Sequence, residues 1–144
     1  MSSRSYALVL VGLSVAVAAL AVDPWDEQCR EQLSLAGAAL ASQGYELTHQ
    51  LYTGELDSGA KKTLGVALEK GRQYALVGVC DEDCKDLDLV LLDLDDEEVD
   101  SDVELDEYPM VEVEVTDAGD FKVKVLMADC RNDPCSYGIG VFAK

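Results

Sequence analysis

The chain has 144 residues, of which 29 are acidic and 11 are Lys or Arg, and its net charge at pH 7 is −18. Charge of this sign and size repels nucleic acid and anionic membrane surfaces, so both are excluded as partners. The length suits a single domain, and the charge leaves open a metal-loaded, cation-binding or salt-adapted secreted protein.

The first 21 residues have the pattern of a secretory signal peptide. Arg4 precedes a charge-free, mostly apolar stretch over 6–20, and Ala19 and Ala21 supply small residues two positions apart. Together these features predict cleavage after Ala21. A membrane-spanning helix is disfavoured because a span needs about 20 apolar residues. We therefore expect a secreted or periplasmic protein.

Residues 24–43 are predicted to form a helix. Asp23 can accept hydrogen bonds from the first free N–H groups, Pro24 suits the first helical position, and Gly44 suits the end. Apolar residues recur every three or four positions and so share one face: Trp25, Cys29, Leu33, Ala36 and Leu40. Cys29 lies on this buried stripe, which favours an inert core thiol over a reactive or intermolecular one.

From residue 45 onward the apolar period changes from helical spacing to alternation. Runs bounded by turn residues predict eight strands, at 46–54, 64–69, 72–80, 86–93, 98–104, 110–116, 120–128 and 135–143. Eight strands without intervening helices favour an antiparallel, jelly-roll-like β-sandwich over a parallel fold. We expect a sandwich domain over 45–144, with the segment 22–44 packed on it as a helix.

Two of these strands are predicted to form a hairpin, 110–116 and 120–127, joined by Asp-Ala-Gly. Glu112 and Glu114 would then face Lys122 and Lys124, and such cross-strand pairs contribute a few tenths of a kcal/mol to about 1 kcal/mol each. The segment 93–107 has ten acids in fifteen positions, so we expect an edge strand with flanking loops there.

Four of the five cysteines form two close pairs, Cys80 with Cys84 and Cys130 with Cys135. In an exported chain such pairs are typical of disulfides. If the strands alternate in direction, both pairs lie at one end of the sandwich, so local pairing and cross-pairing are both geometrically open. We favour local pairing, which stiffens loops: a loop of about five residues contributes roughly 2 kcal/mol, against roughly 4 for one of about fifty.

Aspartates around the first cysteine pair suggest a calcium site formed by Asp81, Asp83, Asp86 and Asp88. Calcium takes six to eight oxygen ligands, which carboxylates and backbone carbonyls can supply. The chain has no D-x-D-x-D-G loop, however. We favour the alternative in which Asp81 and Asp83 are solvated while Asp86 and Asp88 bond to loop backbone, and no cofactor is bound.

No catalytic arrangement stands out. The one histidine, His49, lies in a predicted strand, and the chain has neither a Gly-x-Ser-x-Gly elbow nor the paired histidines of a zinc hydrolase. A hydrolase that uses an acidic pair remains the alternative, although nothing singles out the two carboxylates. We therefore expect a non-catalytic protein.

Several motifs occur in order along the chain: Gly71-x-x-Tyr74, Asp86-Leu87-Asp88-Leu89-Val90-Leu91 with Asp93, Pro109 ahead of Val-x-Val, and Gly119-Asp120-Phe121-Lys122-Val123-Lys124-Val125. Through them, the segment 64–142 resembles the bacterial pre-peptidase C-terminal domain, a small β-sandwich appended to secreted peptidases. The resemblance implies a non-catalytic accessory fold that is calcium-stabilised in some relatives and binds matrix or carbohydrate in others.

The function we expect is that of an exported binding or accessory module. Its cysteine-bearing end, with Tyr137 nearby, would face an extracellular or periplasmic protein or carbohydrate, although Tyr137 fits a core or edge aromatic equally well. A calcium-stabilised structural domain is the second hypothesis, and the hydrolase is the third.

Overall fold

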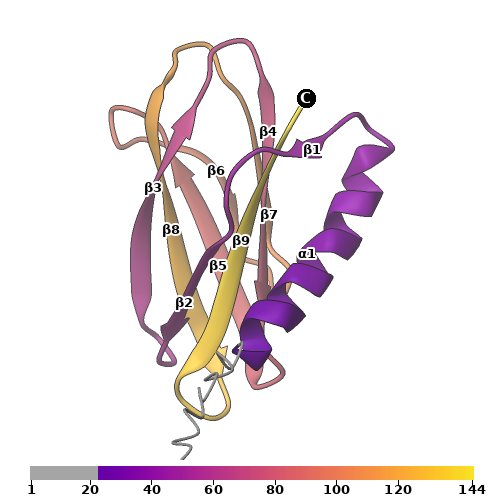
Figure 1. The fold of residues 1–144 in the computed structure, drawn as a ribbon. Helices are drawn as coiled ribbons and strands as arrows, with labels where there is room; N and C mark the ends of the chain where they lie inside the picture. The colour runs from indigo at the N-terminus through magenta and orange to yellow at the C-terminus, as the bar shows by residue number, and fades with distance from the viewer. Residues whose placement is uncertain (1–22) are drawn as a thin grey trace, which may run out of the picture.

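Residues 23–144, which the computed structural model describes, form one helix followed by strands (Figure 1). The elements are α1 (Pro24–Ala41), β1 (Glu46–Leu47), β2 (Tyr52–Leu56), β3 (Lys61–Leu68), β4 (Gln73–Cys80), β5 (Cys84–Leu92), β6 (Glu98–Asp102), β7 (Met110–Glu114), β8 (Gly119–Cys130) and β9 (Cys135–Ala143). The predicted signal peptide and its cleavage site lie outside the described residues.

Two antiparallel sheets pack face to face. One has the order β1-β9-β4-β7, with β2 also paired to β9, and the other has the order β3-β8-β5-β6. From β2 onward the chain changes sheet at every step except β5 to β6, which is the winding of a jelly roll. The predicted fold class is therefore confirmed.

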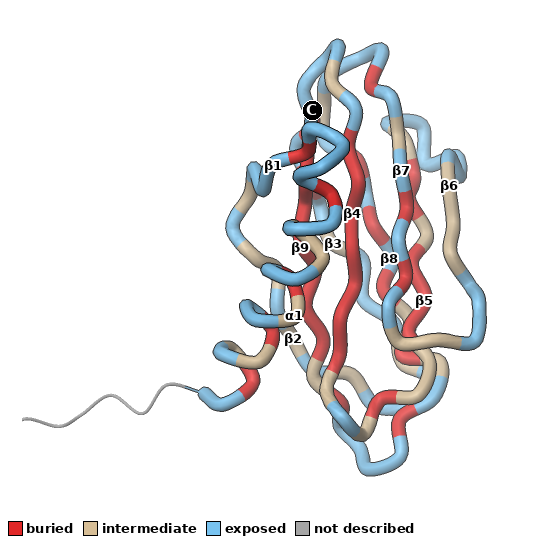
Figure 2. The backbone as a smooth tube through the Cα atoms, turned by 90° about the vertical axis from the view of Figure 1, so that its right-hand side faces the viewer, coloured by how far each residue is buried: buried red, intermediate tan, exposed pale blue. Residues whose placement is uncertain are grey.

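Alternation of apolar residues builds the core between the sheets. Leu87, Leu89 and Leu91 of β5 point inward and are fully buried. The central strands β4 and β9 are buried on both faces, as Figure 2 shows, because α1 covers the outer face of their sheet. Their near-continuous apolar sequence follows from this double burial.

The helix begins and docks as predicted. The Asp23 side chain accepts a hydrogen bond from the backbone N–H of Trp25 at 3.0 Å, and the helix ends at Ala41, close to Gly44. Trp25, Cys29, Leu33 and Leu40 are buried against β4 and β9. Cys29 is a free thiol with no exposed surface, and burial raises its pKa to about 11.

The predicted hairpin of residues 110–116 and 120–127 was wrong. β7 pairs with β4 in one sheet, whereas β8 pairs with β3 and β5 in the other, so the Asp-Ala-Gly segment crosses between sheets. Glu112 lies opposite Ala75, and Lys122 lies opposite Gly65 and Leu92, so the two sets of charges do not pair. The expected acidic edge is present, because β6 is the edge strand of its sheet.

Candidate functional site

A groove lies between α1 and the segment 46–53. That segment was predicted as part of one strand over 46–54, but it is interrupted. Leu47 pairs with Phe142 and Tyr52 pairs with Ile139, so four residues, 48–51, lie opposite only two residues of β9. The extra length makes the chain bulge away from the sheet, and bulges of this kind are common beside functional sites.

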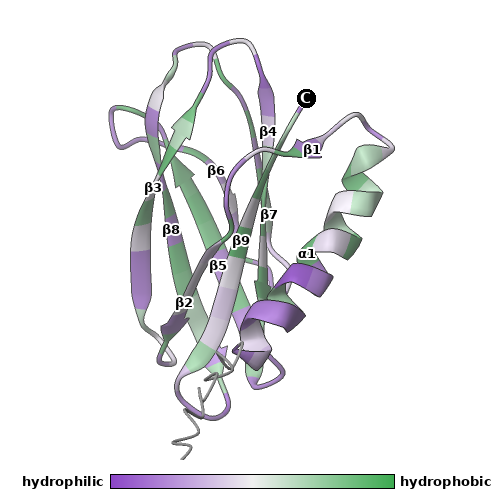
Figure 3. Cartoon of the chain, viewed as in Figure 1, coloured by the Kyte–Doolittle hydropathy of each residue, from purple (hydrophilic) through white to green (hydrophobic). Residues whose placement is uncertain are grey.

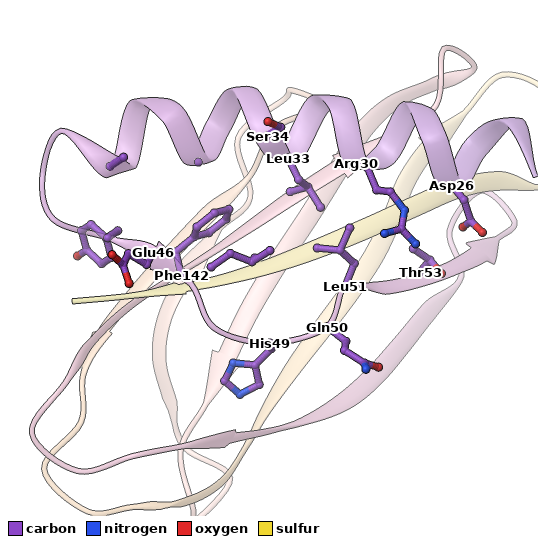
Figure 4. Close-up of a pocket in the computed structure, with 14 residues that line it drawn as sticks. Asp26, Arg30, Leu33, Ser34, Glu46, His49, Gln50, Leu51, Thr53 and Phe142 are labelled. Carbon is purple, nitrogen blue, oxygen red and sulfur yellow. The ribbon is translucent and has the colours of Figure 1, made fainter.

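The groove has a volume of about 980 Å³ and an apolar floor. Figure 4 shows Leu33 from α1 and Leu51 from the bulge pointing toward each other, with Phe142 of β9 beneath the helix. Polar groups stand at the rim, where Figure 3 shows that the first turns of α1 are hydrophilic and its last turns apolar. Asp26 and Arg30 come from these first turns.

Two glycines shape the floor. An added Cβ at Gly37 would lie 2.9 Å from Cε1 of Phe142, and one at Gly140 would lie 2.9 Å from its Cε2. The ring of Phe142 therefore packs closely on the backbone of α1 at Gly37 and of its own strand at Gly140, in space that a side chain at either glycine would fill.

The cation at the rim is available for a ligand. Figure 4 shows the Arg30 side chain reaching from α1 into the groove toward Leu51 and Thr53. Within residues 23–144, Arg30 forms no ion pair. His49 points away from α1, and its ring nitrogens are engaged: Nε2 lies 2.8 Å from the carbonyl oxygen of Ala67, and Nδ1 lies 2.8 Å from Oγ1 of Thr48.

Sequence reasoning missed this groove. Residues 46–54 were predicted as one unbroken strand, and only the successive polar residues Thr48, His49 and Gln50 hint at the break. Arg30 was not among the predicted site residues. Nothing in the local sequence shows that the bulge and the helix lie side by side.

The predicted local disulfides are present at the opposite end of β9 from β1. Cys80 is bonded to Cys84, and Cys130 is bonded to Cys135. Cys84 and Cys130 are neighbours in the register of β5 and β8, so both bridges lie at one end of the sandwich. The two bridges indicate an oxidising compartment outside the cytoplasm. No helix within residues 23–144 is long and apolar enough to span a membrane.

Asp81 joins the two disulfide loops. Its Oδ1 accepts hydrogen bonds from the backbone N–H groups of Asp83 and Cys84, and its Oδ2 accepts one from Ser136 at 2.6 Å. Asp83 accepts a bond from the side-chain amide of Asn132 at 2.8 Å. Both aspartates therefore bond to protein N–H donors, which corrects the expectation that they are simply solvated.

Asp86 and Asp88 lie on β5, away from this hydrogen-bonded loop. In each of them Oδ1 is buried without a hydrogen-bond partner, and burial, followed by the repulsion of nearby carboxylates, raises the pKa of both. Both side chains were expected to bond to loop backbone. At Asp86 a hydrogen bond with the backbone of Asp106, in the loop between β6 and β7, partly offsets the rise in pKa, whereas the Oδ1 atoms of both residues have no such bond. The four predicted calcium ligands do not converge, and no set of three or more His, Cys, Asp or Glu side chains in the described part of the chain is arranged to hold a metal.

Tyr137 does not face solvent. Its side chain is 3% exposed and packs within the core between the sheets, against Gly54 of the neighbouring strand. A Cβ at Gly54 would lie 2.7 Å from the Tyr137 hydroxyl oxygen, so the ring occupies the space that this glycine leaves. The prediction of a ligand-facing Tyr137 was therefore wrong, and the core aromatic is the correct alternative.

Comparison of the sequence with models of protein families and with curated proteins finds no match. The β-sandwich expected from the resemblance to pre-peptidase C-terminal domains is present, and no family model identifies the domain itself.

Proposed function

We propose that the protein is a non-catalytic binding module of the secreted or periplasmic space, with its ligand in the groove beside α1. The groove itself carries the proposal: its volume of about 980 Å³ lies at the upper end of the usual range for ligand pockets, roughly 300–1,000 Å³. An apolar floor with a few polar groups at the rim is also the composition usual for such sites.

The groove suits an apolar ligand that carries an acidic group. The apolar part would contact Leu51 and the small exposed areas of Leu33 and Phe142, each of which is 3% exposed. The acid would pair with the guanidinium of Arg30, in competition with the carboxylate of Asp26 one turn earlier on α1. A carbohydrate fits less well, because sugars stack on open aromatic faces, whereas the ring of Phe142 is 3% exposed. We infer that the partner is a protein segment with apolar and acidic side chains.

Several observations favour a binding role over catalysis. Both ring nitrogens of His49 are already bonded, four cysteines are in disulfides, and Cys29 is buried with its pKa raised. Export is supported by the disulfides and by the signal-like sequence of the first 21 residues. An accessory role also agrees with the resemblance of the β-sandwich to pre-peptidase C-terminal domains, which we retain as part of the proposal.

A probe that matches the groove tests the proposal. Anilinonaphthalene sulfonate has an apolar ring system and one anionic group, and its fluorescence rises in apolar sites. We expect saturable binding to the folded protein. Leu51→Asp should weaken it about tenfold or more by placing a charge on the floor, and Arg30→Gln should weaken it about fivefold by removing the cation.

The matched controls are Leu35→Asp, on the exposed side of α1, and Arg72→Gln, beside Glu69 in the turn between β3 and β4. Neither should change the titration. Equal losses for Leu51→Asp and Leu35→Asp would show that the dye binds elsewhere and would refute the groove as the ligand site. Circular dichroism confirms that each variant is folded.

A further inference from the structure

Exposed apolar side chains gather where the chain passes from β6 to β7. Of the eight large hydrophobic side chains exposed within residues 23–144, four lie at this passage: Val103, Leu105, Tyr108 and Met110. Leu94, in the turn before β6, and Val99, on β6, are exposed too but lie outside it. Leu105 is 89% exposed. Isolated exposed apolar residues are ordinary, but their concentration on one short segment marks an interaction surface.

The segment 103–109, which we call the acidic loop, is fixed in place. Leu87 of β5 donates a backbone hydrogen bond to Asp106 at 2.9 Å, and Gly78 of β4 donates one to Pro109 at 2.8 Å. The Tyr108 backbone N–H donates to the carboxylate of Asp106 at 2.8 Å. The loop is therefore tied to both sheets, and its apolar side chains are held outward by ordered backbone.

The charge of this region is predominantly negative. No Lys, Arg or His occurs from residue 86 to residue 121, and Glu104, Asp106 and Glu107 alternate with the apolar residues of the loop. Within residues 23–144, the one cation paired with the loop is Lys85, whose Nζ lies 3.8 Å from Oε1 of Glu107, so the carboxylates outnumber it. Beside the loop, Asp88 is 8% exposed and its Oδ1 has no hydrogen-bond donor within the described chain. Such a surface attracts cationic groups.

Two other occupants fit the surface poorly. A β-strand of a partner protein cannot pair with the edge of β7, because the backbone N–H groups there are already bonded. The carboxylate of Asp102 accepts a hydrogen bond from the N–H of Met110 at 2.9 Å, and that of Asp100 accepts one from the N–H of Glu112 at 2.7 Å. A second copy of the chain would bring two acidic loops together, and like charges at an interface oppose association. Recognition must therefore use side chains and a partner of opposite charge.

We propose that the acidic loop docks a cationic, apolar segment of a partner protein. Val103, Leu105 and Tyr108 provide the apolar contact, and the carboxylates between them pair with Lys or Arg side chains. β7 and β6 lie at the opposite edge of the sandwich from β1, β2 and the groove (Figure 2). The protein can therefore hold one partner at each edge.

The test uses a short labelled peptide of alternating lysine and leucine, with binding followed by fluorescence anisotropy. The wild-type protein should bind this peptide, and it should not bind a matched peptide with glutamate in place of lysine. The double substitution Leu105→Ser, Tyr108→Ser should weaken binding about tenfold or more, because it removes apolar contact area while leaving every charge in place. The control Leu35→Ser removes a side chain that is 69% exposed on α1, and it should leave affinity unchanged.

Two results would overturn the proposal. Equal affinity of the double variant and the Leu35→Ser variant would mean that the peptide binds by general charge attraction. Self-association of the wild type in sedimentation experiments, lost in the double variant, would make a second copy the occupant. These substitutions lie outside the groove, so this result and that of the dye titration are independent.

Discussion

Gly138→Ala is expected to lower the free energy of unfolding by about 3 kcal/mol. Gly138 lies on β9 under α1, and an added Cβ would lie 2.1 Å from the sulfur of Cys29. Two atoms cannot approach so closely, so the helix or the strand must shift, and the packing of Trp25 and Leu33 beside the contact is lost. Urea denaturation measures the change.

A double-mutant cycle assigns the cause. Cys29→Ala alone should cost about 1 to 2 kcal/mol, because it leaves a small cavity. Combined with Gly138→Ala, it provides the space that the new methyl group needs, so the two changes should couple by at least about 1 kcal/mol. Gly65→Ala is the control, because an added Cβ at this exposed strand glycine meets nothing within 4 Å. If Gly138→Ala were as mild as Gly65→Ala, the close packing of the helix on β9 would be refuted.

Asp81→Ala is expected to destabilise the protein by about 3 kcal/mol. The substitution removes a carboxylate that accepts from three partly buried backbone N–H groups, those of Asp83, Cys84 and Ser136. It therefore weakens the link between the two disulfide loops, which backbone hydrogen bonds such as that from Asp81 to Ser136 still join. Thermal unfolding at neutral pH measures the loss. Glu82→Ala, in the same loop but exposed, should change stability by less than about 0.5 kcal/mol.

The same pair of variants separates hydrogen bonding from calcium binding. If Asp81 acts through N–H groups, neither a chelator nor added calcium changes the melting temperature of the wild type. If instead the chelator lowered the melting temperature of the wild type and had no effect on Asp81→Ala, Asp81 would be a calcium ligand. Equal stability of Asp81→Ala and Glu82→Ala would contradict the loop-joining role itself.

Patterns within single elements were predictable from the sequence. The spacing of apolar residues along a single element shows which of its faces is buried. This holds for the helical spacing of Trp25, Cys29 and Leu33 and for the alternating valines of the strands. Local disulfide pairing was also within reach, since the residues lie four and five positions apart. These features were enough to predict the sandwich, its N-terminal helix and the disulfide-bonded loops at one end.

Pairing between elements was much less predictable. The segment 110–116 alternates identically whether its partner is β8 or β4, because a strand with one dry face looks the same in either sheet. The Asp81 carboxylate accepts a hydrogen bond from Ser136, which lies 55 positions away, and nothing in the local sequence predicts this bond. The groove likewise depends on a bulge at 48–51 meeting a helix that begins at Pro24.

Peptide mapping without reduction, on protein recovered from outside the cytoplasm, tests the central claim most directly. We predict a chain that begins at Val22, with bonds from Cys80 to Cys84 and from Cys130 to Cys135, and with Cys29 alkylated only after denaturation. A protein that keeps its first 21 residues and shows five thiols open to alkylation in the folded state would contradict an exported, disulfide-stiffened binding module.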